Sequence, residues 1–309
     1  MSDIGIDRTV WSGFRLARRH PAAFGLWVVV DMILGLGPSA LLMALMGPNF
    51  FDLVRHSAQA NAQPDQSAIM NLVARAQGLN GLSLLASLVL YAMLYGAIFR
   101  AVLRPSENRW GYLRLGKDEL LMGVLLAIFY IGFVAVLAIA IFVAVLLTAA
   151  ATFASTGLGV AVGVVLTIAL IAGFIWLAAR LSMVLPMSFD ERRFRIAEAW
   201  ALTRGHTKSL LLLAVLLVLL GVGIAVVMFA VLGAAVAAFV ASFSDAAQMQ
   251  TFFTQPTSDV MRELTPWGLA AAALSAVVST FGLVIFTAPW AEAYRQITGD
   301  RATTEEVFG

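Results

Sequence analysis

The sequence contains no cysteine, which excludes disulfide frameworks, iron–sulfur clusters, thiolate zinc sites and cysteine nucleophiles. Charged residues are scarce too, at 12% of the 309 residues, whereas a soluble domain carries about 25%. The net charge of +2 is too small to indicate a nucleic-acid partner. The chain also lacks a His-Glu-x-x-His helix, a nucleophile elbow, a Walker loop and a paired-glycine nucleotide fingerprint. We therefore predict a protein that is not an enzyme and that uses no cofactor and no metal.

Apolar residues are abundant and make up 61% of the chain. A soluble protein of this composition could not cover its surface with polar groups, whereas lipid-facing positions can be as apolar as a core. Six apolar stretches reach the roughly 20 residues that cross a hydrocarbon core of about 30 Å. They cover residues 22–47, 80–103, 120–149, 157–187, 209–242 and 266–291. The predicted fold class is all-α, a polytopic membrane protein whose six transmembrane helices form one domain over residues 1–309.

The basic residues predict the orientation of these helices. Seventeen of the twenty Lys and Arg residues lie on one side: before the first span, after the sixth, or at and between the facing ends of the second and third and of the fourth and fifth spans. The other side holds only Arg55, Arg75 and Arg262. Because Lys and Arg concentrate in cytoplasmic loops, we predict that both termini are cytoplasmic.

The N-terminal segment does not resemble a cleaved signal peptide. Residues 1–20 are polar and basic, and the apolar run that follows is longer than the roughly 7–15 residues of a signal core. We expect the first helix to remain as an anchor. Only Lys117 and Lys208 are lysines, and with abundant alanine this usage is typical of GC-rich bacterial genomes, so we predict the bacterial inner membrane.

A Trp-x-x-x-Arg pattern recurs at three equivalent places on the predicted cytoplasmic side. Its members are Trp11 with Arg15, Trp110 with Arg114, and Trp200 with Arg204. Each Trp precedes an outward-going span by about ten residues, and the spacings of 99 and 90 residues are close to one hairpin of two spans. We predict three hairpin-like repeats, each introduced by a short interfacial helix.

Residues four apart lie on one face of a helix, so each Trp and its Arg would point the same way. Tryptophan prefers the headgroup level of a membrane, and arginine can contact lipid phosphate or stack on the indole. Two interpretations stay open. The pairs either only anchor the helices, or form a contact surface for lipid headgroups or a partner protein.

A resemblance appears around the third pair. Ser188-Phe189-Asp190-Glu191 is followed by Ile196-Ala-Glu-Ala-Trp200-Ala-Leu-Thr-Arg-Gly-His206 and by an apolar run from Leu210. These residues resemble a bacterial family of multi-span proteins known as glycerophosphoryl diester phosphodiesterase membrane-domain-like. The resemblance implies a membrane location and a helical fold. It does not imply phosphodiesterase activity, because the catalytic domain fused to some family members has no counterpart here.

Asp31 is the most conspicuous polar residue inside a predicted span. It lies nine residues after the start of the first span, which corresponds to a depth of roughly 13 Å at about 1.5 Å per residue. A carboxylate at this depth usually faces a bundle interior or a hydrated cavity. We expect Arg100 and Arg180 to be its partners. Asp31 is then the polar centre of a transport path, or else half of a buried ion pair or a protonated carboxyl that fixes helix packing.

Two further patterns concern packing and helix ends. Gly159-x-x-x-Gly163 in the fourth span permits close approach of another helix. The carboxylate pairs Asp118-Glu119 and Asp190-Glu191 could hold a divalent ion, but we expect them at helix N-termini, where they complement the helix dipole.

These observations favour a non-enzymatic membrane protein that organises lipids or partner proteins through interfacial helices on its cytoplasmic face. Membrane lipids are the expected partners, with a membrane protein or a second copy of the chain as further possibilities. The alternative is a transporter or channel for a small solute or ion, with Asp31 at its centre. A membrane-embedded enzyme would require a polar cluster at one depth in the bundle.

Overall fold

The computed structural model describes residues 5–37, 66–242, 244, 245, 248, 251 and 257–308. Helices dominate, and no strand occurs within these ranges, so the all-α prediction is confirmed. Long runs of Leu, Ala, Val and Ile favour this outcome, because a helix satisfies its own backbone hydrogen bonds without water.

Among the described residues, five helical segments are long and apolar enough to cross a membrane. They are Ser83–Leu103, Trp110–Ala154, Thr156–Glu191, Thr207–Ala230 and Ala273–Gly299. They coincide with the second to sixth predicted spans and mark the chain as a membrane-embedded protein. A shorter apolar helix, Pro21–Leu34, occupies the start of the first predicted span, and residues 38–47 of that span lie outside the described residues. Six spans and three repeats therefore remain a prediction.

The chain packs into two compact units, which are described separately. Unit 2 comprises residues 20–91 and 221–283. It contains α3 (Pro21–Asp31), the π-helical turn η1 (Met32–Leu36) and parts of three long helices. Those helices are α5 (Gln66–Leu103), α10 (Thr207–Ala241) and α12 (Thr257–Phe308).

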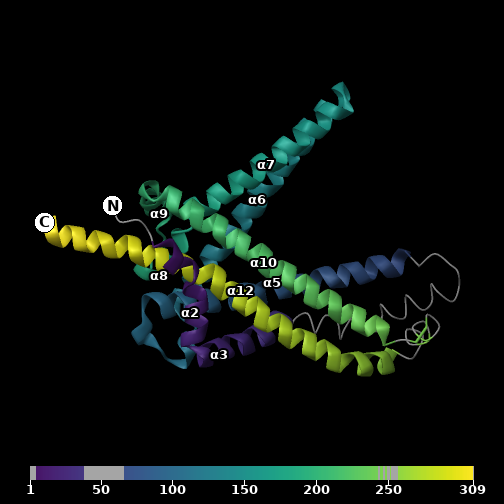
Figure 1. The fold of residues 1–309 in the computed structure, drawn as a ribbon. Coiled ribbons are helices and arrows are strands. Elements are labelled where there is room, and N and C mark those ends of the chain that lie inside the picture. Colours follow the sequence, from purple (N-terminus) through teal and green to yellow (C-terminus); the bar gives the residue numbers. More distant parts are fainter. Residues whose placement is uncertain are drawn as a thin grey trace. The chain divides into compact units, whose positions relative to one another are not determined.

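Unit 1 comprises residues 1–19, 92–220 and 284–309. Within the described residues, it contains the remaining parts of α5, α10 and α12 together with six further α-helices, most of which are labelled in Figure 1. These are α1 (Ile6–Val10), α2 (Ser12–Arg19), α6 (Lys117–Ala154), α7 (Thr156–Leu181), α8 (Val184–Glu191) and α9 (Ile196–Leu202). Its core includes Phe99, Met122, Leu125, Met183 and Phe189, all of which are fully buried.

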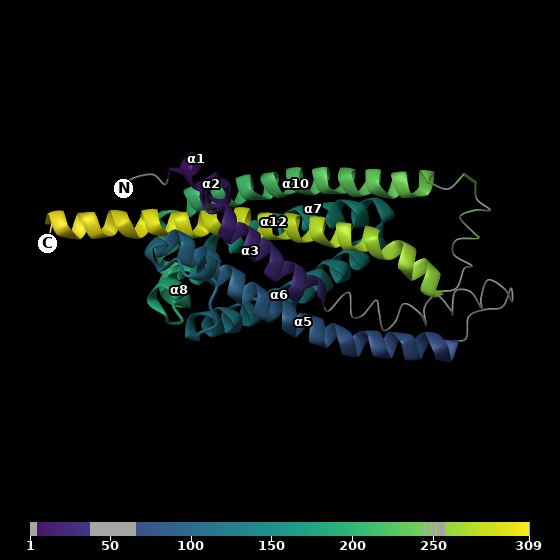
Figure 2. The ribbon, with the colours of Figure 1, turned by 90° about the horizontal axis from the view of Figure 1, so that it is seen from below.

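Helices α6 and α7 form a hairpin and run side by side (Figures 1 and 2). The Ser155 hydroxyl caps α7 by accepting a hydrogen bond from the Leu158 N–H at 3.2 Å. A Cβ built on Gly159 would overlap Thr152 Oγ1 and lie 3.0 Å from Thr152 Cα, and one on Gly163 would lie 3.4 Å from Thr148 Cγ2. The predicted close approach at these two glycines is confirmed, and its partner is the preceding helix α6.

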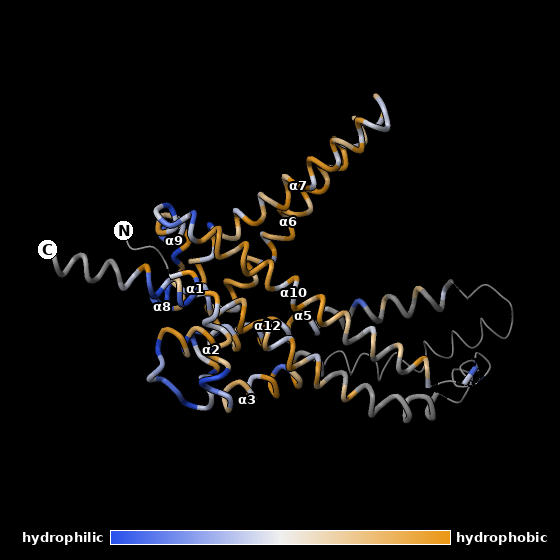
Figure 3. The backbone as a smooth tube through the Cα atoms, viewed as in Figure 1, coloured by the Kyte–Doolittle hydropathy of each residue, from blue (hydrophilic) through white to orange (hydrophobic). Residues whose placement is uncertain are grey.

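The residues of this hairpin are apolar along most of its length (Figure 3). The most apolar window of α6 has no buried residue, and that of α7 has almost none. Such a surface is stable in lipid and would aggregate in water. Hydrophilic residues gather instead near α1, α8 and α9 (Figure 3).

The N-terminal helices of unit 1 pack on the end of α12. A Cβ on Gly13 would lie 2.7 Å from Ile285 Cα and 2.9 Å from Val284 O, so only glycine fits this contact. The Gly5 N–H donates to Gln296 Oε1 at 3.0 Å. The first Trp-x-x-x-Arg segment is therefore attached to α12 through its own glycine.

Candidate functional site

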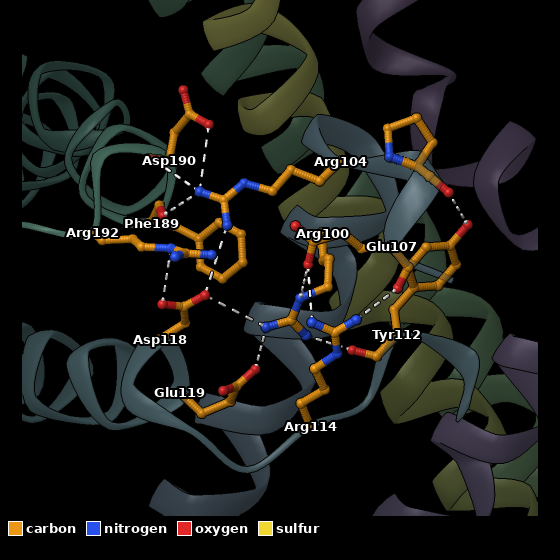
Figure 4. A network of polar contacts seen from close by, with 11 residues as sticks. Arg100, Arg104, Glu107, Tyr112, Arg114, Asp118, Glu119, Phe189, Asp190 and Arg192 are labelled. Carbon is orange, nitrogen blue, oxygen red and sulfur yellow. Dashed lines mark hydrogen bonds and ion pairs between the residues drawn. The ribbon is translucent and has the colours of Figure 1, made fainter. Parts of the chain in front are cut away.

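A buried arginine lies at the centre of a polar network in unit 1 (Figure 4). Arg100, in the last turn of α5, is 1% exposed. Its Nη2 lies 2.5 Å from Glu119 Oε1, and Glu119 is also buried. Its Nη1 donates to the backbone carbonyl of Tyr112 at 2.6 Å. A buried charge is stable only when it is paired and hydrogen-bonded in this way.

Asp118 links three arginines. Its carboxylate lies 3.9 Å from Arg100 Nη2, 3.7 Å from Arg104 Nη1 and 3.4 Å from Arg192 Nε. Asp118 and Glu119 stand in the first turn of α6, as predicted, and so also complement its dipole. The sequence did not indicate that both carboxylates pair with arginines of other segments. We call Arg100, Arg104, Asp118 and Glu119 the arginine cluster.

Helix α8 completes the arginine cluster with an aromatic ring and backbone oxygens. The Arg100 and Arg104 guanidiniums lie 5.6 Å and 5.3 Å from the Phe189 ring centroid, within cation–π range. Arg104 Nη2 also donates to the Asp190 carbonyl at 2.7 Å. Arg192, with φ of 55°, caps this end of α8.

The placement of Asp190-Glu191 at a helix N-terminus is wrong, because the pair ends α8. A carboxylate there opposes the helix dipole. Arg104 compensates, since its Nη2 lies 3.9 Å from Asp190 Oδ1.

The arginine cluster supports a loop of residues 104–116, which we call the Trp110 loop. Trp110, Gly111 and Tyr112 have φ values of 50°, 62° and 65°, a left-handed turn that two non-glycine residues adopt only when other contacts hold them. Tyr112 is buried and donates from its hydroxyl to the Pro105 carbonyl at 3.4 Å. Trp110 is 85% exposed.

The prediction of an interfacial helix at Trp110 and Arg114 is wrong. Residues Trp110–Tyr112 form a 3-10 turn with non-helical dihedrals, so the two side chains do not share a helix face. Arg114 Nη1 pairs instead with Glu107 Oε2 at 3.0 Å. The hydrogen bond from Arg100 to the Tyr112 carbonyl is one of the contacts that hold this turn, and local sequence does not indicate it.

The other two pairs also differ from one another. Trp11 is exposed in the junction between α1 and α2, and Arg15 lies in α2. Trp200 lies in α9 and Arg204 in the turn Thr203–Gly205 that follows it. The guanidinium that lies over the Trp200 ring, at 4.5 Å, belongs to Arg180.

Arg180 is buried at the end of α7 and donates from Nη1 to Thr203 Oγ1 at 3.0 Å and to Thr207 Oγ1 at 3.3 Å. Asp31 is buried in unit 2, at the end of α3, and accepts a hydrogen bond from Thr280 Oγ1 at 3.0 Å. Arg100 and Arg180, the expected partners of Asp31, thus have these other partners in unit 1. The pairing with Asp31 stays a prediction.

An exposed ion pair network precedes α9. Arg195 lies 2.7 Å from Glu191 Oε2 and 2.9 Å from Glu198 Oε1. The hydrogen bond to Glu198 and the charge of Glu191 raise the pKa of Arg195 above its ordinary value. The pKa of Glu198 is lowered, first by its own backbone N–H and then by Arg195.

The residues that sequence reasoning missed are Arg104, Tyr112 and Phe189. A signal for Arg104 was present, since it lies one helical turn after Arg100. Within the described ranges, no group of three His, Asp or Glu side chains could hold a metal ion. The arrangement is suited to holding the Trp110 loop in one conformation rather than to acid–base chemistry, because both of its carboxylates, Asp118 and the buried Glu119, are paired with arginines.

No protein-family model, curated protein or solved structure matches this chain. The geometry of unit 1 therefore carries the functional argument.

Proposed function

We propose that this protein is a non-enzymatic integral membrane protein that organises lipids at the cytoplasmic face of a bacterial inner membrane. The observation that carries the proposal is Trp110, whose indole is exposed on a loop that a buried ionic cluster holds in place. Its neighbours Arg109 and Arg114 are exposed cations, and Leu115 is an exposed apolar side chain. This combination is stable at a headgroup layer, where indole, guanidinium and leucine each find a suitable environment.

The fixed conformation of the Trp110 loop favours binding. A mobile loop would lose conformational entropy on contact with headgroups, whereas a preorganised loop loses little. The strained left-handed turn would relax if nothing held it, so the arginine cluster accounts for the exposure of Trp110. The Trp11 and Trp200 segments would add further contacts at the same membrane face, as the repeat predicts.

The test is the retention of anionic lipid by the purified protein. An Arg near an anionic surface contributes about 1 kcal/mol, so Arg109→Ser is expected to weaken binding about fivefold. The doubly substituted Trp110→Ser and Arg109→Ser protein, in nanodiscs of phosphatidylethanolamine and phosphatidylglycerol, should retain less phosphatidylglycerol by native mass spectrometry. Phe153→Ser is the matched control, because Phe153 is equally exposed but lies at the opposite end of α6. If the unsubstituted protein, the double variant and Phe153→Ser retain equal amounts of phosphatidylglycerol, the proposal is rejected.

Transport is the second candidate, and the geometry around Asp31 favours it. The buried carboxylate is hydrogen-bonded by Thr280 and directly precedes the π-helical turn Met32–Leu36. Such turns are frequent at functional sites. The native chain has no cysteine, so a single Ala276→Cys substitution, one turn before Thr280 on α12, can report on hydration. Modification of this buried position by a charged methanethiosulfonate would support a hydrated path, and complete protection would reject it.

A further inference from the structure

An apolar groove of about 610 Å³ lies within unit 1, between the end of α5, α6, α7, α8, the start of α9 and residues 286–290 of α12. Its walls are mainly aromatic and aliphatic, and include Phe99, Phe133, Phe174 and Trp290. The volume is in the range of small-molecule sites. None of its lining residues belongs to the arginine cluster or the Trp110 loop.

The dimensions of the groove fit one alkyl chain. Its lining residues on α6 run from Ile128 to Val136, which is about 12 Å at 1.5 Å per residue. One leaflet of the hydrocarbon core is about 15 Å thick. The groove therefore matches the length of a lipid chain within a single leaflet, and it lies in helices that are apolar enough to be embedded there.

One hydroxyl in the wall of the groove has no hydrogen-bond partner. Thr287 is 2% exposed, and no atom of the described residues pairs with its Oγ1. Five helical threonines in the described residues bond to the carbonyl four residues earlier, as Thr298 does to Tyr294 at 2.9 Å in the same helix. A buried hydroxyl without a partner is destabilising unless a bound molecule supplies one.

We propose that this groove binds one alkyl chain of a membrane lipid and that the Thr287 hydroxyl hydrogen-bonds to an oxygen of that lipid. The alkyl chain covers the aromatic wall, and a carbonyl or hydroxyl oxygen of the same molecule accepts from or donates to Thr287. The site extends the proposed function from headgroup contact to the capture of a single lipid. The groove and the Trp110 loop share no residues, so a test can reject one of the two proposals and leave the other standing.

The experiment uses two photoreactive probes with the full-length protein in nanodiscs. One is phosphatidylglycerol with a diazirine in one acyl chain, and the other is palmitate with the same diazirine. Crosslinks to peptides of α6, α7 and α12 that line the groove are expected from at least one probe. Labelling by phosphatidylglycerol identifies a phospholipid chain, and labelling by palmitate alone identifies a free fatty acid. Crosslinks confined to other surfaces would overturn the proposal.

The blocking variant is Gly132→Phe. Gly132 lines the groove, and a Cβ built on it meets no atom within 4 Å, so a phenyl ring can enter the groove without a backbone clash. Gly173→Phe is the matched control, since Gly173 on α7 has equally open surroundings and does not line the groove. Groove labelling should fall at least tenfold in Gly132→Phe and stay unchanged in Gly173→Phe. Equal labelling in both would overturn the proposal.

Thr287→Val keeps the shape of the wall and removes the hydroxyl. Loss of one hydrogen bond to the lipid is expected to lower groove labelling about fivefold. Unchanged labelling in Thr287→Val would show that the Thr287 hydroxyl does not contribute to lipid binding. Groove peptides crosslinked to a second copy of this chain would show that a protein helix, and not a lipid, fills the groove. The Trp110→Ser and Arg109→Ser protein should label the groove as the unsubstituted protein does.

Discussion

Replacement of Glu119 by leucine is the sharpest test of the arginine cluster. Glu119 and Arg100 are both buried, and their closest atoms are 2.5 Å apart. Removal of one partner from a buried ion pair costs about 3–5 kcal/mol, because the other charge is left uncompensated. Asp118 and Glu107 lie 3.9 Å and 3.7 Å from the Arg100 guanidinium and would compensate in part. We therefore expect Glu119→Leu to lower the free energy of unfolding by about 3 kcal/mol.

A second substitution distinguishes the ion pair from simple packing. In the Arg100→Met and Glu119→Leu double variant, no charge of the pair remains, and apolar side chains fill a similar volume. Such replacements are often neutral apart from other lost contacts. Here the Tyr112 carbonyl loses its donor, which costs about 1–3 kcal/mol. The double variant should thus be less destabilised than the sum of the single variants, with a coupling energy of about 2 kcal/mol.

The assay is reversible unfolding in mixed micelles, with the denaturing detergent fraction as the variable. Asp7→Leu is the control, because Asp7 is an exposed carboxylate of α1 and its loss should change stability by no more than about 0.5 kcal/mol. A spin label on Leu115→Cys reports the Trp110 loop in the same proteins. Its mobility should rise when Glu119 is replaced.

Three results would each refute one step of this reasoning. If Glu119→Leu lowers the free energy of unfolding by less than about 1 kcal/mol, the pair behaves as a solvent-exposed ion pair, which contributes little to stability. Strict additivity in the double variant would show that Arg100 and Glu119 act independently. An unchanged spin-label spectrum in Glu119→Leu would show that the ion pair does not determine the conformation of the Trp110 loop.

The remaining predictions concern packing and topology. Gly159→Leu should separate α6 from α7 and lower the thermal unfolding temperature in detergent, since its Cβ would overlap Thr152, whereas Gly157→Leu, with open surroundings, should not. Gly13→Ala should loosen the N-terminal helices from α12, whose backbone lies 2.7 Å from the added Cβ, and so increase protease cleavage before residue 20. Single cysteines at Ala60 and Gln250 should react with a membrane-impermeant maleimide only from outside the cell, and labelling only after permeabilisation would reverse the predicted orientation.

The fold class of this protein could be predicted from its sequence, because it depends on the length and apolar content of each segment, which do not require knowledge of tertiary contacts. The length and apolar content of each run determine whether a helix can exist in lipid, so five predicted spans recur as apolar helices. The close approach of another helix at Gly159 could also be predicted from the sequence, because the absence of a side chain permits close packing whichever helix is the partner.

Tertiary structure decided how the polar residues are paired. Glu119 meets Arg100 across 19 residues of chain, and Asp190 meets Arg104 across 86, distances over which no sequence pattern specifies a partner. The turn at Trp110 is of the same kind, because a left-handed conformation of tryptophan is locally unfavourable and is held by contacts with other residues, among them the hydrogen bond from Arg100 to the Tyr112 carbonyl. Local sequence thus determined which segments are helices in lipid, and long-range packing determined which charges are buried and which tryptophan is exposed.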